Sequence, residues 1–183
     1  IYEGLIELDD ELKPAPALAE SWAVSNDGRV WTFKLKDDVK WHDGVKLSIE
    51  DVLFTINVLR FGGFDSYYAK IFNRIPGIQT IKSMGQDTLY IELDEPVSYL
   101  LDSLTFPIVP KHIFEYVEES PEEQDDERDL IEDDQLEDLG NSEKDDEVDI
   151  QYIKLQNLMP IGTGPYKVES GSYNPYEGFS LVR

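Results

Sequence analysis

The sequence contains no cysteine, few basic residues and no long apolar run. Without Cys there is no disulfide, no thiolate nucleophile and no Cys-ligated zinc or iron–sulfur site. No apolar stretch approaches the ~20 residues that a membrane-spanning helix needs. Lys and Arg total 16 against 39 Asp and Glu, which gives a formal net charge of −23. Because phosphate binding depends on clustered cations, this balance argues against nucleic acid or an anionic membrane surface as the partner.

The remaining composition is typical of a folded domain. Apolar residues make up 40% and aromatic residues 11% of the 183 positions, which is enough for a buried core and too much for wholesale disorder. The length suits one domain, or one domain with a long appendage. The chain opens at Ile1 without an initiator Met or a basic leader, and both ends have a strand-like pattern. We therefore expect a piece of a longer protein.

The negative charge is concentrated in residues 115–149. These 35 residues hold 19 acidic and two basic side chains, a net charge of −17, whereas the rest of the chain carries a net charge of −6. Like charges at this density repel one another, so we expect a flexible, solvated insert. The alternative is a calcium-binding segment, because hard cations prefer carboxylate oxygens. The alternating acids, central Gly and terminal Glu of an EF-hand loop are missing, however.

Alternation of apolar and polar residues predicts the strands. In the first, Trp31, Phe33 and Leu35 fall on one face, and Leu89, Ile91 and Leu93 repeat this pattern later. The predicted strands are residues 29–35, 39–41, 88–93 and 179–182.

Helical spacing of apolar residues predicts three helices. Ser48 offers an N-cap hydroxyl, with Asp51 in the capping-box position, before a helix over residues 49–60. Pro96 opens a second helix over residues 96–104, and Pro110 opens a third that extends to Val117. The elements show no regular strand–helix–strand rhythm. The predicted fold class is therefore α+β, with a mixed, mainly antiparallel sheet and three to four helices.

No motif in the sequence predicts catalysis or a metal site. His42 and Asp43 adjoin, but Asp43-Gly44 also suits a tight turn, and the sole other histidine is His112. Gly162-Thr163-Gly164 lacks the Lys of a P-loop, and Pro165 follows it, so we expect a structural turn. The abundant carboxylates of the insert are no basis for acid–base catalysis. We predict a protein that is not an enzyme and that uses no cofactor.

One segment rich in aromatic residues could form a binding surface. Between Phe61 and Tyr68, two glycines are flanked by aromatic residues, and such a loop can present its rings outward. The alternative is that the rings pack on the helix that they follow.

A series of short motifs resembles one protein family. The motifs follow one another at short spacing in the first half of the chain and resume near its end. They are Pro16-Ala17-Leu18-Ala19-Glu20-Ser21-Trp22, Asp27-Gly28, Trp31-Thr32-Phe33-Lys34-Leu35, Val39-Lys40-Trp41-His42-Asp43-Gly44, Ser48-Ile49-Glu50-Asp51-Val52 and Pro160-Ile161-Gly162-Thr163-Gly164-Pro165-Tyr166-Lys167. The series resembles the family 5 extracellular solute-binding proteins, which are the oligopeptide-, dipeptide- and nickel-binding components of ABC importers. The acidic insert matches nothing in the family pattern.

The resemblance implies a domain organisation. Family members have two lobes that close over the ligand, in a periplasmic-binding-protein type II-like fold, and a small domain lies between strands of the first lobe. Residues 1–114 and 150–183 then form the small α+β domain with the start of the strand that returns to the first lobe. Residues 115–149 form the insert, and the second lobe is absent from the chain.

The resemblance also implies a function and a ligand contact. The family's Ser-x-Tyr-Ala segment, whose Tyr faces the ligand in peptide binders, matches Ser66-Tyr67-Tyr68-Ala69, so Tyr68 is the expected ligand-binding residue and Tyr67 its neighbour. The expected function is capture of oligopeptides and their delivery to an ABC permease, by a monomeric extracellular or periplasmic receptor whose parent is lipid-anchored to the membrane. Alternatives are a receptor for nickel or another solute, and a structural or interaction module with a calcium-binding insert.

Overall fold

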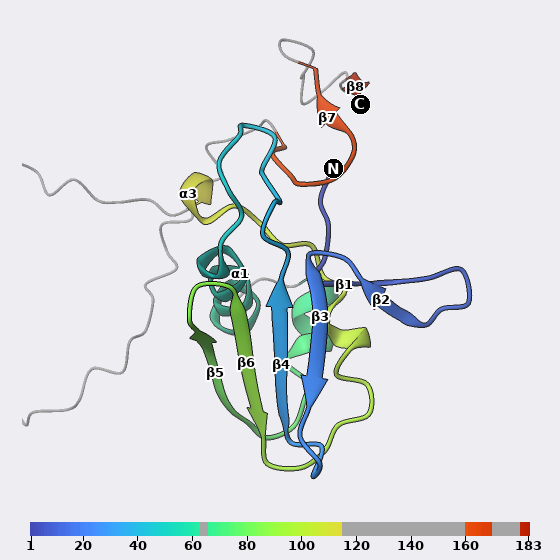
Figure 1. Ribbon diagram of the computed structural model, residues 1–183, viewed down its shortest axis with the longest axis vertical. Helices are drawn as coiled ribbons and strands as arrows, with labels where there is room; N and C mark the ends of the chain where they lie inside the picture. Colours follow the sequence, from blue (N-terminus) through green and yellow to red (C-terminus); the bar gives the residue numbers. More distant parts are fainter. Residues whose placement is uncertain (63–65, 115–159, 170–179) are drawn as a thin grey trace, which may run out of the picture.

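The computed structural model describes residues 1–62, 66–114, 160–169 and 180–183 (Figure 1). The segment 115–149, for which we predicted a flexible insert or a calcium site, lies outside the described residues. Val117 and Phe179, which we placed in a helix and a strand, lie outside them as well.

A four-stranded antiparallel sheet with the strand order β3-β4-β6-β5 forms the centre of the fold. Its strands are β3 (Ala19–Val24), β4 (Val30–Leu35), β5 (Ile78–Met84) and β6 (Thr88–Leu93). The register sets Phe33 opposite Leu89 and Trp31 opposite Ile91. Because directly opposed residues share a face, these side chains point to the same side of the sheet. The alternation at residues 29–35 and 88–93 is therefore confirmed.

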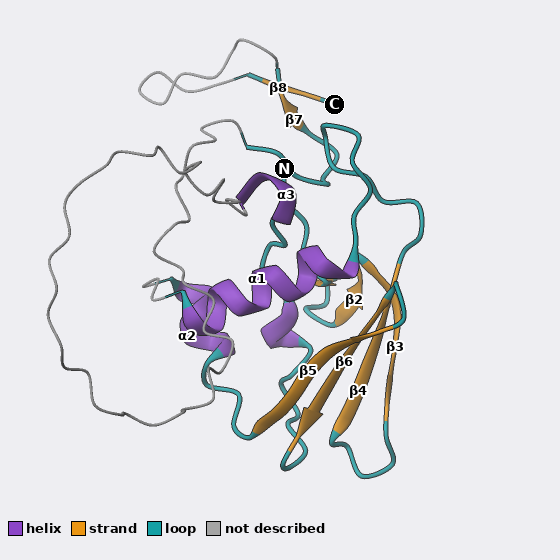
Figure 2. Ribbon diagram, turned by 90° about the vertical axis from the view of Figure 1, so that its left-hand side faces the viewer, coloured by secondary structure: helices purple, strands orange, loops and turns teal. Residues whose placement is uncertain are grey.

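Helices cover this apolar face of the sheet (Figure 2). The longest is α1 (Ile49–Phe61), which matches the predicted helix over residues 49–60. The Asp51 carboxylate accepts a hydrogen bond from the Ser48 N–H at 2.8 Å, as the capping-box spacing predicts. On the same side lie α2 (Tyr67–Phe72) and the 3₁₀ turn η1 (Asp102–Leu104), whereas α3 (Lys111–Phe114) packs beside α1, away from the sheet (Figure 2).

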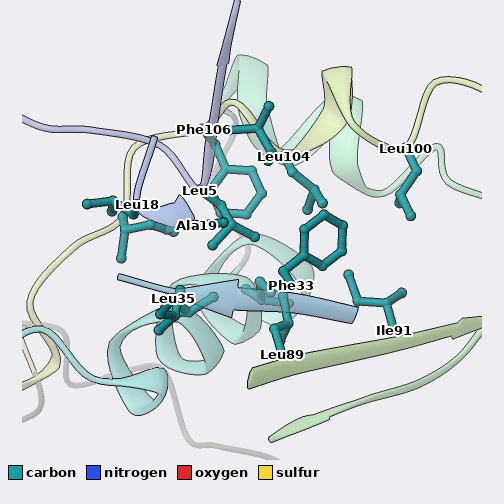
Figure 3. Packing of buried hydrophobic residues seen from close by; sticks show 14 of the residues in the cluster. Leu5, Leu18, Ala19, Phe33, Leu35, Leu89, Ile91, Leu100, Leu104 and Phe106 are labelled. Atoms are coloured by element: carbon teal, nitrogen blue, oxygen red, sulfur yellow. The ribbon is translucent and has the colours of Figure 1, made fainter. Parts of the chain in front are cut away.

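The core lies between the sheet and the helices. Phe33, Leu89 and Ile91 point from the sheet toward Leu104 and Phe106 (Figure 3), and each of the five is at most 1% exposed. Burial of such side chains stabilises the fold by about 1.5–3 kcal/mol each.

Two small sheets flank the central one. One is the hairpin of β1 (Ile6–Leu8) and β2 (Pro14–Pro16), and the other is the ribbon of β7 (Lys167–Val168) and β8 (Leu181–Val182). The N-terminal segment runs between the core and this ribbon (Figure 1). The Ile1 carbonyl accepts a hydrogen bond from the Gly164 N–H at 2.7 Å, and the Ile108 N–H donates to the Glu3 carbonyl at 2.9 Å.

Three predicted elements differ from the structure. Residues 39–41 form a single bridge between Lys40 and Lys46 instead of a strand, because the chain turns back at once. Residues 96–104 form turns that end in η1, with Ser103 N–H shared between the Tyr99 and Leu100 carbonyls, so the helical spacing is met without a helix. The segment 61–68 is not one loop, because Tyr67 and Tyr68 begin α2.

Candidate functional site

The two predicted ligand-binding residues lie side by side in the first turn of α2. The Tyr67 side chain is 73% exposed and that of Tyr68 is 40% exposed. Their ring centroids are 5.8 Å apart with the planes at 71°, an edge-to-face contact. Neither ring is buried against α1, so the outward-facing arrangement holds for both.

Local sequence sets the direction of these two rings. Ser66 caps α2, because its Oγ accepts a hydrogen bond from the Ala69 N–H at 3.0 Å. Ala69 and Phe72 lie on the buried side of the helix, and the Phe72 ring meets Phe106 edge to face at 5.6 Å. With that side of a short helix fixed in the core, Tyr67 lies on the outer side. Tyr68, one turn before Phe72, lies at the edge of the buried side and is accordingly less exposed.

Hydrogen bonds from neighbouring elements hold the far end of α2. The Asn73 side-chain amide donates to the Leu59 carbonyl in the last turn of α1 at 3.0 Å. The Tyr99 hydroxyl donates to the Arg74 carbonyl at 3.3 Å. These two hydrogen bonds help to fix the orientation of α2, and with it the positions of the two exposed tyrosine rings.

A third exposed aromatic residue, Phe61, is the last residue of α1. Phe61 is 60% exposed, and the Arg60 guanidinium lies 5.0 Å from the centre of its ring, within the range of a cation–π contact. Phe61 and the tyrosine pair thus lie on the two helices that flank residues 63–65.

A second cluster forms where the turn at residues 41–44 meets α3. The structure brings together His112 and Asp43, whose Nε2 and Oδ2 atoms are 2.8 Å apart. Burial would raise the pKa of Asp43, but hydrogen bonds from His112 and the Val45 N–H outweigh it and hold this pKa below its usual value. A carboxyl group with a lowered pKa stabilises the fold above its unfolded pKa, and this contribution is lost as the pH falls through the lower folded pKa.

His42, which precedes Asp43, bonds to a different part of the chain. Its Nδ1 accepts from the Gly162 N–H at 3.2 Å, and its Nε2 lies 2.8 Å from the Gly164 carbonyl oxygen. Its backbone N–H donates to the Gly162 carbonyl at 2.9 Å. The Gly-Thr-Gly segment forms a bend rather than the hydrogen-bonded turn that we predicted, and His42 holds its backbone.

Two hollows open on the described part of the chain, one beside the β7–β8 ribbon and one near an end of the central sheet. One, of about 420 Å³, is lined by His42, Asp43, Pro160, Ile161, Lys167, Val168, Glu169 and Val182. The other, of about 460 Å³, lies beside the start of α1 and the β5–β6 turn. Among the described residues, no three His, Asp or Glu side chains lie close enough to hold a metal ion. No described helix is both long and apolar enough to cross a membrane.

Sequence reasoning missed the contacts of both histidines, and the ligand-binding role of the tyrosine pair stays a prediction. His42 lies 120 positions from Gly162, and Asp43 lies 69 positions from His112. No local pattern in a single sequence indicates contacts at such separations.

Comparison with protein families gives a match over most of the chain. The model described as "Bacterial extracellular solute-binding proteins, family 5 Middle" matches residues 13–183. The periplasmic oligopeptide-binding protein OppA of Escherichia coli is 33% identical over 132 residues, which cover 63% of this chain and 24% of that protein. The chain thus spans about a quarter of the length of this curated relative.

Solved structures with different ligands resemble this one. The binding protein DppA of Helicobacter pylori, in complex with the peptide STSA, superposes with a TM-score of 0.67 at 25% identity, over 100% of this chain and 33% of that one. NikZ of Campylobacter jejuni, in complex with Ni(L-His), superposes with a TM-score of 0.65 at 29% identity, over 92% of this chain and 27% of that one. The fold accordingly occurs in proteins solved with a peptide and with a nickel complex.

Proposed function

This chain belongs to the family 5 bacterial extracellular solute-binding proteins, and from that membership we propose that it forms part of a receptor that captures oligopeptides and delivers them to an ABC permease. The role is binding rather than catalysis. The receptor works outside the cytoplasmic membrane, as a monomer whose parent protein is lipid-anchored. The observation that carries the choice of peptide is the outward tyrosine pair on α2, at the position of the family's Ser-x-Tyr-Ala segment.

An exposed ring on a fixed helix suits a permissive peptide site. A ring face adds apolar contact area at low entropic cost and does not require one particular ligand side chain. Tyr68 is less exposed than Tyr67, and its edge-to-face neighbour limits how far its ring can turn. In the proposed site, Tyr68 contacts the peptide and Tyr67 supports it.

Closure of two lobes would complete the site. A ligand that binds the closed form more tightly than the open form shifts the equilibrium toward closure. Hydrogen bonds to the peptide backbone, in the manner of strand addition, would give affinity that is largely independent of sequence. The share contributed by this chain is the aromatic surface, and the rest of the receptor supplies the opposite wall.

A receptor for nickel or another small solute is the second candidate, favoured by the likeness to the protein solved with Ni(L-His). The described residues include no group of three or more potential metal ligands. Under this alternative the other lobe or the bound ligand itself would have to supply the coordinating atoms.

Substitution of Tyr68 tests the proposed contact. In the receptor that contains this chain, we expect Tyr68→Ala to weaken the binding of tri- and tetrapeptides by about tenfold, because a packed ring contributes about 1 kcal/mol or more. Tyr68→Phe keeps the ring and should bind within about twofold of the wild type. Isothermal titration calorimetry measures both, and thermal unfolding verifies that the variants fold.

Tyr67→Ala is the matched control, since it removes the neighbouring ring from the same helix. We expect it to weaken binding by about threefold at most. Wild-type affinity in Tyr68→Ala would exclude Tyr68 as a ligand contact. A larger loss in Tyr67→Ala than in Tyr68→Ala would move the contact to Tyr67.

A further inference from the structure

Both ring nitrogens of His42 bond to the backbone of one short segment. A carbonyl oxygen can only accept, so Nε2, 2.8 Å from the Gly164 oxygen, carries the hydrogen. An N–H can only donate, so Nδ1, 3.2 Å from the Gly162 nitrogen, carries none. The geometry therefore requires a neutral imidazole in its Nε2–H form.

Protonation is incompatible with one of these two bonds. In the imidazolium both ring nitrogens are donors, so a protonated Nδ1 would face the Gly162 N–H donor to donor. Imidazole groups ordinarily take up a proton between about pH 8 and pH 5. Mild acid thus converts an attractive contact into a repulsive one at this position.

We propose that His42 is a proton-sensitive clamp on the Gly162 amide, whose N–H donates to Nδ1 at neutral pH and loses this acceptor in mild acid. The amide lies in the described residues 160–169, which lead from the 41–44 turn into β7. The inference concerns the attachment of that segment and is independent of which solute the receptor binds.

Other contacts of the segment do not depend on Nδ1. The His42 N–H donates to the Gly162 carbonyl at 2.9 Å, and the Gly164 N–H donates to the Ile1 carbonyl at 2.7 Å. The bond from Nε2 to the Gly164 oxygen persists in the imidazolium, where it becomes charge-assisted. Acid should therefore affect the Gly162 amide and leave the rest of the segment in place.

Charged groups from several elements face His42. Asp43 on its own turn, Lys167 on β7 and Glu169 after β7 line the same hollow as His42. On α3, His112 donates to Asp43, and a protonated His112 strengthens that pair. Acid should therefore break the contact of His42 Nδ1 with Gly162 and tighten the His112 contact.

The chain suits a direct test because it contains two histidines. The amide of Gly162 is followed by hydrogen exchange and NMR in the 183-residue chain at about pH 7.5 and about pH 5. Rates are divided by the intrinsic rate at each pH, so that only protection is compared. In the wild type we expect the protection of the Gly162 amide to fall by about tenfold on acidification, the effect of one lost hydrogen bond.

Two variants assign this change to one histidine. His112→Gln removes the other imidazole and should retain the tenfold fall, whereas His42→Gln cannot be protonated and should change by less than about twofold. Constant protection in the wild type, or an equal fall in His42→Gln, would overturn the proposal. So would loss of the effect in His112→Gln.

A second measurement needs no variant. Nitrogen-15 shifts of the imidazole ring report its tautomer, and the clamp requires the Nε2–H form of His42 at about pH 7.5. Observation of the Nδ1–H form would contradict the proposal even if His42→Gln fails to fold.

Discussion

At the residue scale, Leu12 stands out among the described residues by its backbone conformation. It lies at the tip of the β1–β2 hairpin with a φ of 60°, a region that costs a residue with a Cβ roughly 1–2 kcal/mol. Its side chain is 76% exposed, so burial offsets little of this cost. The hairpin tip is held instead by Asp9, whose carboxylate accepts hydrogen bonds from the Glu11 and Lys13 N–H groups at 2.9 Å.

Substitution of Leu12 should therefore change stability through the backbone. We expect Leu12→Asn to raise the free energy of unfolding by about 0.5–1 kcal/mol, because Asn tolerates the left-handed region. Leu12→Val, with a β-branched side chain, should lower it by about 1 kcal/mol. Urea denaturation measures the free energy of unfolding of both variants. Equal stability of Leu12→Val and Leu12→Asn would show that the backbone at this position is not strained.

At the scale of elements, one buried carboxylate joins α1 to α3. Asp51 is 4% exposed, and its Oδ2 accepts from the Ser48 N–H at 2.8 Å and the Ser48 hydroxyl at 3.0 Å. Its Oδ1 accepts from the Lys111 N–H at 2.8 Å. The same side chain thus satisfies the start of the long helix and the start of α3, 60 positions later.

Loss of this carboxylate should be costly. Asp51→Ala leaves two partly buried N–H groups without their acceptor, and we expect a loss of about 3 kcal/mol in the free energy of unfolding. Glu50→Ala is the matched control from the same helical turn. Glu50 is exposed and its carboxylate lies 3.6 Å from Lys111 Nζ, so its loss should cost only about 0.5–1 kcal/mol through this exposed pair and the helix dipole. Chemical denaturation of both variants gives the difference. Equal losses in the two would mean that Asp51 does not link the elements.

Sequence reasoning worked best for elements with a long, regular pattern. The helix α1 and the strands β4 and β6 follow the predicted ranges because their burial repeats with the period of the element. The edge strands β3 and β5 were missed, because each is bulged and partly exposed, with shifts in register at Ala19/Ser21 and Ile78/Thr80. At residues 96–104, the buried residues Val97, Leu100 and Leu104 have the spacing of a helix, although the chain forms turns and the short η1 there.

At the scale of the whole molecule, the arrangement depends on contacts between distant segments. The N-terminal residues, the turn at residues 41–44, α3 and residues 160–164 meet through hydrogen bonds such as those of His42 and Asp43. Pairing of this kind follows from the tertiary fold and not from local periodicity. The tyrosine pair was named from the resemblance to a family, and no local pattern identifies it as a ligand contact. Both residues are exposed, and their role in binding stays a prediction.

The ligand of the whole receptor is the most direct test of the proposed function. The receptor that contains this chain is purified without added solute, and the bound molecules are released by mild denaturation and identified by mass spectrometry. Our account predicts a mixture of short peptides of varied sequence, because ring faces and backbone hydrogen bonds discriminate little among side chains. A single non-peptide solute, or a metal complex, would contradict the peptide assignment and the role given to Tyr68.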